Sequence, residues 1–181
     1  MIVLLTGASH TGKTKLAQRL LERKGWPYLS LDHLKMGLIR SGQTPLTPLS
    51  GDAALTALLW PIAREIARTC AENGQNLVLE GCYIPADWRA GLDAATCAQV
   101  RAVCLALSEG FLRAQFAQVC AHASDIERRA GENLTLDWLL AQNAAFAPYD
   151  AAHGWTRLCI EADYEREMQA FWEGSEWKTT F

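Results

Sequence analysis

The residues from Gly7 to Thr14 combine types and a spacing that suit the binding of phosphate groups. They read GASHTGKT, which fits the pattern G-x-x-x-x-G-K-[ST], and they follow the apolar run Ile2-Val3-Leu4-Leu5. Glycines let the backbone wrap closely around phosphate oxygens, and successive amide N–H groups at the start of a helix oppose negative charge. The segment therefore predicts a phosphate-binding loop between a strand and a helix.

The side chains at the end of this segment carry its predicted chemistry. Lys13 is expected to reach the β- and γ-phosphates of a nucleotide, and the Thr14 hydroxyl is expected to complete the coordination shell of Mg²⁺. The other nucleotide contacts are expected to come mainly from backbone amides, with no catalytic role for His10; these residues are Gly7, Ser9, His10, Thr11 and Gly12. The alternative is a glycine-rich strand-to-helix turn with a lysine on the surface.

Length and composition favour one globular domain spanning residues 1–181. Hydrophobic residues make up 50% of the chain, and 17 basic residues against 20 acidic ones give a net charge of −3. Because there is no concentrated basic surface, neither nucleic acid nor an anionic membrane is an expected partner. The 6 cysteines form no C-x-x-C pair, so they are expected to be reduced core residues in a cytoplasmic protein. No segment approaches the roughly 18 apolar residues of a membrane span.

Apolar runs and helical periodicities alternate along the chain, which predicts an α/β fold. Strands are expected at residues 2–5, 28–31, 76–81, 100–107 and 155–160. Helices are expected from the end of the phosphate-binding loop to about residue 24, and at 33–40, 52–73, 86–96, from 108 or 109 onward, at 135–147 and at 165–172. Right-handed crossovers then give a parallel sheet with helices on both faces.

The carboxyl ends of parallel strands share one edge of the sheet, and ligands bind at that edge. The phosphate-binding loop, Asp32 and Glu80 each follow a predicted strand. Residues that are far apart in the chain are therefore expected to converge there.

This arrangement resembles the small P-loop kinases, a group that includes adenylate, shikimate, gluconate and chloramphenicol kinases and the zeta-type toxins. The segments YLSLDHLKMGLIRSG (residues 28–42) and NLVLEGCYIP (residues 76–85) look most similar to bacterial ATP-binding proteins labelled 2-phosphoglycerate kinases or adenylate kinases. The resemblance implies a three-layer P-loop NTPase fold whose five-stranded parallel sheet has the order 2-3-1-4-5, with ATP and Mg²⁺ as cofactors.

The resemblance also implies a role for the acid after the second strand, which corresponds to Asp32. In many of these kinases that acid contacts the acceptor hydroxyl and takes its proton, because a carboxylate near the γ-phosphate can orient the nucleophile while it stays ionised. The alternative for Asp32 is an N-cap of the helix that starts at His33. Arg40 either clamps an anionic group of the acceptor or is a solvated arginine in the last turn of that helix.

Glu80 matches a position at which the related kinases usually have Asp. It is expected to support the metal, with contact through a water, or the substrate; the alternative is an acid at a strand end that faces solvent. Gly81 is expected to let the substrate approach the backbone, and Tyr83 either stacks on the substrate or packs in the core.

Two connecting segments are expected to close over the site. Residues 41–51 carry two prolines and no periodicity, which predicts a substrate loop. Residues 122–133 are highly charged and match the lid region of the resembling kinases. There Arg129 is expected to neutralise charge on the transferred group and Arg128 to contact the nucleotide, with Arg113 as a further candidate. The alternative is a helical face of exposed charge.

The leading hypothesis is an ATP- and Mg²⁺-dependent phosphotransferase that acts on a small hydroxylated or anionic metabolite, as a monomer or a homodimer. One alternative is a nucleoside monophosphate kinase, although the Asp-Gly-Phe-Pro-Arg motif of adenylate kinases is replaced here by EGCYIP at residues 80–85. Another alternative is a regulator that binds a nucleotide without transferring phosphate.

Overall fold

Five parallel strands form the centre of the structure, a computed structural model that describes residues 1–124 and 134–174, the side chains of 122–124 excepted. Their order in the sheet is β2-β3-β1-β4-β5. This order and the parallel pairing confirm the predicted sheet. The strands are β1 (Ile2–Thr6), β2 (Tyr28–Ser30), β3 (Leu77–Glu80), β4 (Val100–Leu107) and β5 (Trp155–Ile160).

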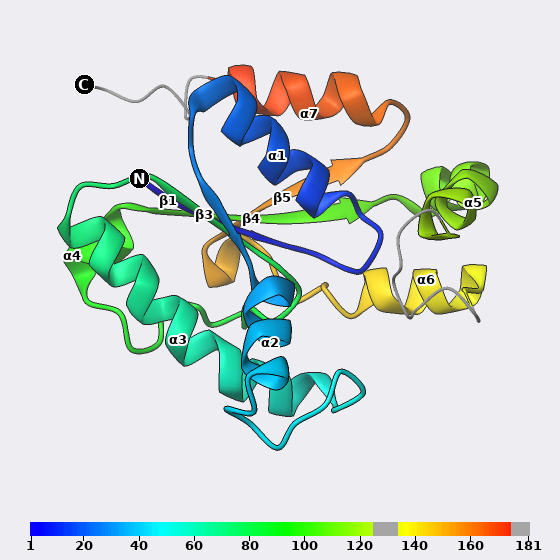
Figure 1. Ribbon diagram of the computed structural model, residues 1–181. Coiled ribbons are helices and arrows are strands. Elements are labelled where there is room, and N and C mark those ends of the chain that lie inside the picture. Colours follow the sequence, from blue (N-terminus) through cyan, green and yellow to red (C-terminus); the bar gives the residue numbers. More distant parts are fainter. Residues whose placement is uncertain (125–133, 175–181) are drawn as a thin grey trace.

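Helices cover both faces of the sheet, as predicted. Figure 1 shows α1 and α7 on one face and α3 on the other, with α2 beside the first half of α3. The helices are α1 (Lys13–Lys24), α2 (Leu31–Arg40), α3 (Asp52–Glu72), α4 (Ala94–Ala98), α5 (Glu109–Ser124), α6 (Leu136–Ala144) and α7 (Tyr164–Glu173), and a 3₁₀ turn spans Ala151–His153. The result is a three-layer α/β architecture.

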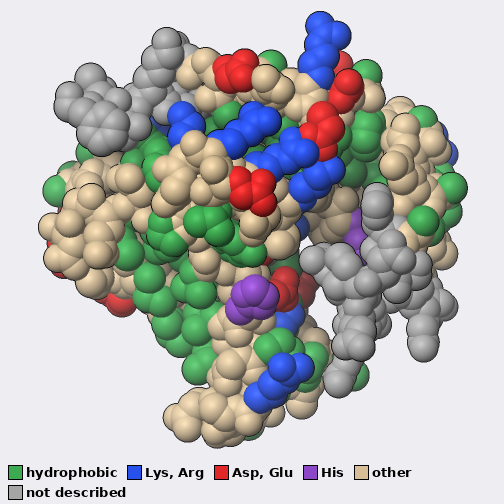
Figure 2. Space-filling view, turned by 45° about the horizontal axis from the view of Figure 1, so that its top comes forward, with side chains coloured by type: hydrophobic (Ala, Val, Ile, Leu, Met, Phe, Trp, Pro, Cys, Tyr) green, Lys and Arg blue, Asp and Glu red, His purple; other side chains and the backbone are tan. Residues whose placement is uncertain are grey.

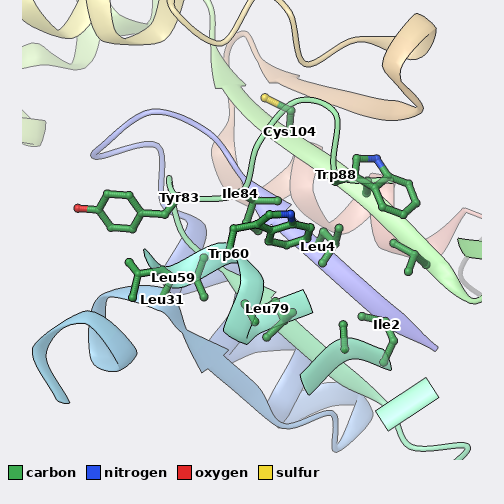
Figure 3. Packing of buried hydrophobic residues seen from close by; sticks show 14 of the residues in the cluster. Ile2, Leu4, Leu31, Leu59, Trp60, Leu79, Tyr83, Ile84, Trp88 and Cys104 are labelled. Atoms are coloured by element: carbon green, nitrogen blue, oxygen red, sulfur yellow. The ribbon is translucent and has the colours of Figure 1, made fainter. Parts of the chain in front are cut away.

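The alternation of side chains along β1 divides the core into two halves. Ile2 and Leu4 point toward α3, whereas Val3 and Leu5 point toward α1 and α7, and all four are fully buried. Burying such a side chain contributes about 1.5–3 kcal/mol. Figure 3 shows the half of the core on the α3 side, where side chains of the sheet and the helices interlock. The central strand is therefore held firmly from both faces.

Two local differences from the sequence-based expectation matter for the site. Strand β2 ends at Ser30, which is the N-cap residue of α2, so Asp32 lies inside the first turn and is not the cap. Residues 86–91 form turns in place of the expected helix at 86–96, and helical structure is confined to α4. Gly91 has a φ of +80°, which no helix accommodates, and the Asp93 side chain caps α4 by accepting a hydrogen bond from the Thr96 amide.

The six cysteines are free thiols, as expected, but five of them are only partly buried and are not full core residues. Cys104 is buried in β4, and burial raises its pKa to about 11, so this thiol is protonated at neutral pH. Within residues 1–124 and 134–174, none of the helices is both long enough and apolar enough to cross a membrane.

Candidate active site

The loop of residues 7–14 turns sharply between β1 and α1. Gly7 has a φ of +141° and Gly12 a φ of +88°, both in the region that favours glycine. A Cβ on Gly7 would lie 2.1 Å from the carbonyl oxygen of Leu105 in β4, so this position accepts no side chain. The loop is thus pressed against the neighbouring strand at the carboxyl edge of the sheet.

Two side chains of the loop bind the same backbone oxygen. Lys13 Nζ donates a hydrogen bond to the carbonyl oxygen of Ala8 at 2.7 Å, and Thr11 Oγ1 donates to that oxygen at 2.9 Å. Lys13 is also the first residue of α1, where the partial positive charge of the helix N-terminus adds to that of the ammonium. This arrangement concentrates positive charge at the loop and at the start of α1, which suits an anion.

Helix α7 supports the loop from outside. The Tyr164 hydroxyl donates to the carbonyl oxygen of Gly12 at 2.7 Å, and burial raises the pKa of Tyr164, which keeps the hydroxyl protonated. Lys15 lies over the Tyr164 ring and pairs with Glu165 at 2.6 Å, and Glu165 also pairs with Arg19. Figure 2 shows Lys and Arg side chains gathered around acidic ones on this face. The first turns of α1 and α7 are therefore fixed to each other.

A cavity of about 320 Å³ opens beside the loop. Leu107, Phe111 and Val119 give it apolar walls, and Gln115 and Gln118 add amide groups. Tyr164 and its neighbours at the start of α7 close the opposite side. Its volume and mixed lining are typical of a small-molecule site.

Glu80 and Thr14 bring two oxygens together next to the loop. Glu80 ends β3 and is only 2% exposed, and the Thr14 hydroxyl donates to Glu80 Oε1 at 3.2 Å. Within the described parts of the chain, no three His, Cys, Asp or Glu side chains gather into a metal-binding group. Mg²⁺ prefers oxygen ligands and usually takes few of them from the protein, the rest coming from phosphates and water. This pair therefore fits Mg²⁺ held together with a nucleotide.

The backbone after β3 packs against α2. Gly81 has a φ of +154°, and a Cβ there would lie 2.9 Å from Leu31 Cβ, while the Gly81 carbonyl oxygen accepts from Thr6 Oγ1 at 2.9 Å. The close approach that the sequence suggested at Gly81 is thus occupied by the first residue of α2. Gly81 fixes where α2 begins relative to β3.

Asp32 belongs to a small hydrogen-bonded network that includes Lys35, a residue that the sequence interpretation missed. Lys35 Nζ donates to Asp32 Oδ1 at 2.6 Å and to the Tyr83 hydroxyl at 2.9 Å. The spacing of three between Asp32 and Lys35 could have predicted their pairing on a helix. The contact with Tyr83, which is 48 residues away in the chain, could not have been predicted from spacing.

The predicted arginines lie apart from this network or outside the described residues. Arg40 is exposed at the opposite end of α2, about 12 Å along the helix axis from Asp32. Arg113 forms an exposed ion pair with Glu109 one turn away on α5, at 2.7 Å. Arg128 and Arg129, together with the rest of the expected lid at 122–133, lie outside the residues whose side chains the structure describes.

The expected substrate loop joins α2 to α3. Leu46 in this loop packs against the core, whereas Leu49 is 86% exposed. The loop of residues 41–51 is therefore anchored at one point and presents an apolar side chain to solvent.

A strand, a glycine-rich loop and a helix at the edge of a parallel sheet with the order 2-3-1-4-5 define the small P-loop kinase fold. Residues 2–148 match the AAA domain family, and the chain belongs to that family. No curated protein matches the chain.

Solved structures share this fold at low sequence identity. A Chloroflexus aurantiacus protein provisionally described as a kinase is 19% identical, with a TM-score of 0.59 over 95% of this chain and 94% of that one. The Mycobacterium tuberculosis APS kinase, solved with AMPPNP and APS, is 20% identical, with a TM-score of 0.55 over 95% of each chain. The Aquifex aeolicus shikimate kinase is 13% identical, with a TM-score of 0.54 over 97% of this chain and 96% of that one. At such identities the likeness concerns the fold.

Proposed function

We propose that this protein is an ATP- and Mg²⁺-dependent phosphotransferase that acts on a small hydroxylated metabolite. One observation carries the proposal: at the carboxyl edge of the sheet, the loop of residues 7–14 holds Lys13 Nζ 2.7 Å from the Ala8 carbonyl oxygen, and the Thr14 hydroxyl beside it donates to Glu80 Oε1 at 3.2 Å. An ammonium and a pair of oxygen ligands at a helix N-terminus support binding of a nucleotide with its metal ion.

The nucleotide side of the site binds and neutralises phosphate. Backbone amides of the loop hold the phosphates, and the Lys13 ammonium compensates their negative charge. Thr14 and Glu80 would hold the magnesium ion, which would supply charge compensation on the phosphates. The cavity beside the loop takes the rest of the nucleotide, between Phe111 and Tyr164.

Asp32 acts on the acceptor. It accepts the proton of the acceptor hydroxyl while the oxygen of that hydroxyl forms a bond to the γ-phosphorus. The bond between the γ-phosphorus and the β–γ bridging oxygen breaks at the same time, and ADP is released. Its side chain is 56% exposed, so an acceptor can reach it. Arg129 remains the predicted lid residue that neutralises charge on the transferred group, with Arg128 on the nucleotide. Residues 41–51 and 122–133 remain the predicted covers of the site.

Two relatives support a small acceptor: the shikimate kinase by its name and the APS kinase by the APS bound in its structure. Both share only the fold with this chain, so the class of acceptor is part of the proposal. We also propose that the protein acts in the cytoplasm, because its six thiols are free. We propose further that it is a monomer or a homodimer.

The test is transfer of the γ-phosphoryl group from ATP to pooled hydroxylated metabolites and nucleoside monophosphates, followed by mass spectrometry of new phosphorylated products. We expect one class of hydroxylated acceptor to gain a phosphate with the wild-type protein. Lys13→Ala should lose this activity by at least about 100-fold. Lys24→Ala, which removes an exposed lysine at the end of α1, is the matched control and should retain it.

Other results would change the assignment. A product among the nucleoside diphosphates would indicate a nucleoside monophosphate kinase. ATP binding, detected by calorimetry, without a phosphorylated product in any pool would indicate a nucleotide-binding regulator. Absence of ATP binding would contradict the whole proposal.

A further inference from the structure

Lys35 occupies an unusual place for a lysine on a surface helix. Asp and Lys three residues apart normally pair where both are solvated, at little cost or gain. Here the Lys35 side chain is only 12% exposed, although its partner Asp32 is 56% exposed. Removing an ammonium from water is unfavourable unless it is paired and hydrogen-bonded. The contacts of Lys35 must therefore compensate for its burial.

Tyr83 provides the second contact and comes from a different element. Its ring belongs to the core cluster on the α3 side and is 6% exposed, and Figure 3 shows its hydroxyl pointing away from Leu31 and Ile84. Lys35 Nζ donates to that hydroxyl and lies 4.9 Å from the ring centroid. The face of Tyr83 is thus covered by an ammonium, so the ring packs in the core and offers no platform on which a substrate could stack.

The charges in this network are stable at neutral pH. Burial alone would lower the pKa of Lys35, but the hydrogen bonds to Asp32 and Tyr83, with the attraction of Asp32, outweigh it and raise the pKa. Burial raises the pKa of Tyr83 to about 12, although Lys35 opposes this shift. A charged ammonium therefore bridges a carboxylate and a neutral phenol.

Given the proposed function, we propose that Lys35 and Tyr83 are positioning residues that fix the orientation of Asp32 toward the acceptor. Lys35 occupies Asp32 Oδ1, and within the described residues no donor binds the other oxygen, Oδ2. Without this bond an exposed carboxylate rotates freely. With it, Oδ2 keeps one direction and can accept the proton of the acceptor hydroxyl. Tyr83 links Lys35 to the segment after β3. The orientation of the Asp32 carboxylate is therefore fixed relative to the sheet.

Steady-state kinetics with the acceptor found above test this proposal. Lys35→Met should lower kcat about 10- to 100-fold, the range typical of residues that orient a functional group, and should leave the KM values for ATP and acceptor within about threefold. Lys35→Arg should recover most of kcat, because guanidinium also donates to a carboxylate. Tyr83→Phe should lower kcat severalfold. Lys24→Met, which removes an exposed lysine, is the control and should behave as wild type.

A double-mutant cycle separates positioning from a purely structural role. If Lys35 acts through Asp32, Lys35→Met should have little further effect on kcat in the Asp32→Asn background. Independent, multiplicative effects would overturn the proposal. So would an unchanged kcat in Lys35→Met, or a tenfold rise in acceptor KM at constant kcat, which would mean that Lys35 binds the acceptor directly.

One measurement needs no acceptor and keeps the proposal testable if no transfer is found. In ¹⁵N NMR spectra near pH 6, the Lys35 ammonium should give a slowly exchanging signal, unlike that of Lys24, and the signal should broaden in Asp32→Asn and in Tyr83→Phe. If no protected lysine signal is observed in the wild type, the network is wrong. A protected signal in a protein that transfers no phosphate would leave the network intact and refute the proposed function, and with it a role in positioning.

Discussion

Main-chain atoms hold the loop of residues 7–14, whereas side chains hold Asp32. In the loop, Lys13 and Thr11 bind the Ala8 carbonyl oxygen, and Tyr164 binds that of Gly12. Around Asp32, the bonds join the carboxylate, an ammonium and a phenol from two separate elements. Backbone groups are the same in every protein, so a loop held by its backbone needs only a few particular residues and can form in many different sequences. The residues of a side-chain network can be substituted without altering the fold, and such substitutions allow different proteins of one fold to differ in substrate.

The comparison predicts that substitutions in the two regions change different quantities: turnover at Asp32, and ATP affinity in the loop of residues 7–14. The largest change is expected for turnover. Asp32→Asn removes the proposed proton acceptor and the charged partner of Lys35, so turnover should fall about 10²- to 10⁴-fold. ATP affinity, measured by calorimetry, should change less than twofold, because no backbone of the loop is altered. Asp137→Asn, an exposed acid in the first turn of α6, is the control. Full turnover of Asp32→Asn would remove Asp32 from the mechanism.

A backbone change should damage the nucleotide side. Gly7→Ala places a Cβ 2.1 Å from the Leu105 carbonyl oxygen at a φ of +141°, so the loop must shift, and ATP affinity should weaken about 10- to 100-fold. Gly37→Ala in α2 meets no atom within 4 Å and should leave ATP affinity unchanged, with equal or slightly greater stability. Calorimetry and thermal unfolding of both variants provide the measurement. Equal effects at the two positions would contradict the special geometry of Gly7.

A smaller effect is expected at the support of the loop. Tyr164→Phe removes one hydrogen bond to the Gly12 carbonyl oxygen, and a loss of about 0.5–1.5 kcal/mol corresponds to a two- to tenfold weaker Kd for ATP. The KM for the acceptor should not change. Tyr28→Phe in β2, whose hydroxyl makes no hydrogen bond within the described residues, is the matched control. A change in acceptor KM in Tyr164→Phe would mean that the two regions are coupled.

The smallest effect concerns the segment before α7. The Glu167 carboxylate accepts hydrogen bonds from the backbone amides of Glu161, Ala162 and Asp163, and the bonds from Asp163 and Ala162 lower its pKa most. A lowered folded-state pKa stabilises the protein above the unfolded pKa of about 4.3, and this stabilisation is lost as the pH falls through the native value. Because Glu167 is only partly buried, Glu167→Gln should lower Tm at pH 7 by only about 2 °C.

The pH dependence of this difference in Tm tests whether the charge of the Glu167 carboxylate is the cause. The difference in Tm between wild type and Glu167→Gln should shrink when the pH falls from 7 to 3. Glu72→Gln, an exposed acid at the end of α3 without such bonds, should show no loss at pH 7. A difference that persists at pH 3 would mean that the carboxylate charge does not stabilise this segment.

Features that depend on local pattern could be predicted from the sequence. The apolar run before Gly7 became β1, and the run from Val100 to Leu107 became β4 with the same bounds, because buried parallel strands require continuous apolar residues. The sheet order came from the resemblance of the chain to P-loop kinases. The helix expected at 86–96 was wrong, because the positive φ of Gly91 and the cap at Asp93 outweighed its helical pattern.

The candidate site was predictable only in part, for the same physical reason. The loop and Asp32 follow strands and Glu80 ends one, so a strand prediction places them at one edge. The positions of side chains depend on tertiary packing: Lys35 covers the Tyr83 ring, Leu31 fills the space at Gly81, and Tyr164 reaches Gly12 from 152 residues away. No periodicity in the chain encodes such contacts.

The bond from Tyr164 to Gly12 also orders events during synthesis. The hydroxyl that supports the loop is translated 152 residues after Gly12. A growing chain therefore carries the complete loop of residues 7–14 without this hydrogen bond while those residues are made, and gains the bond only when α7 docks.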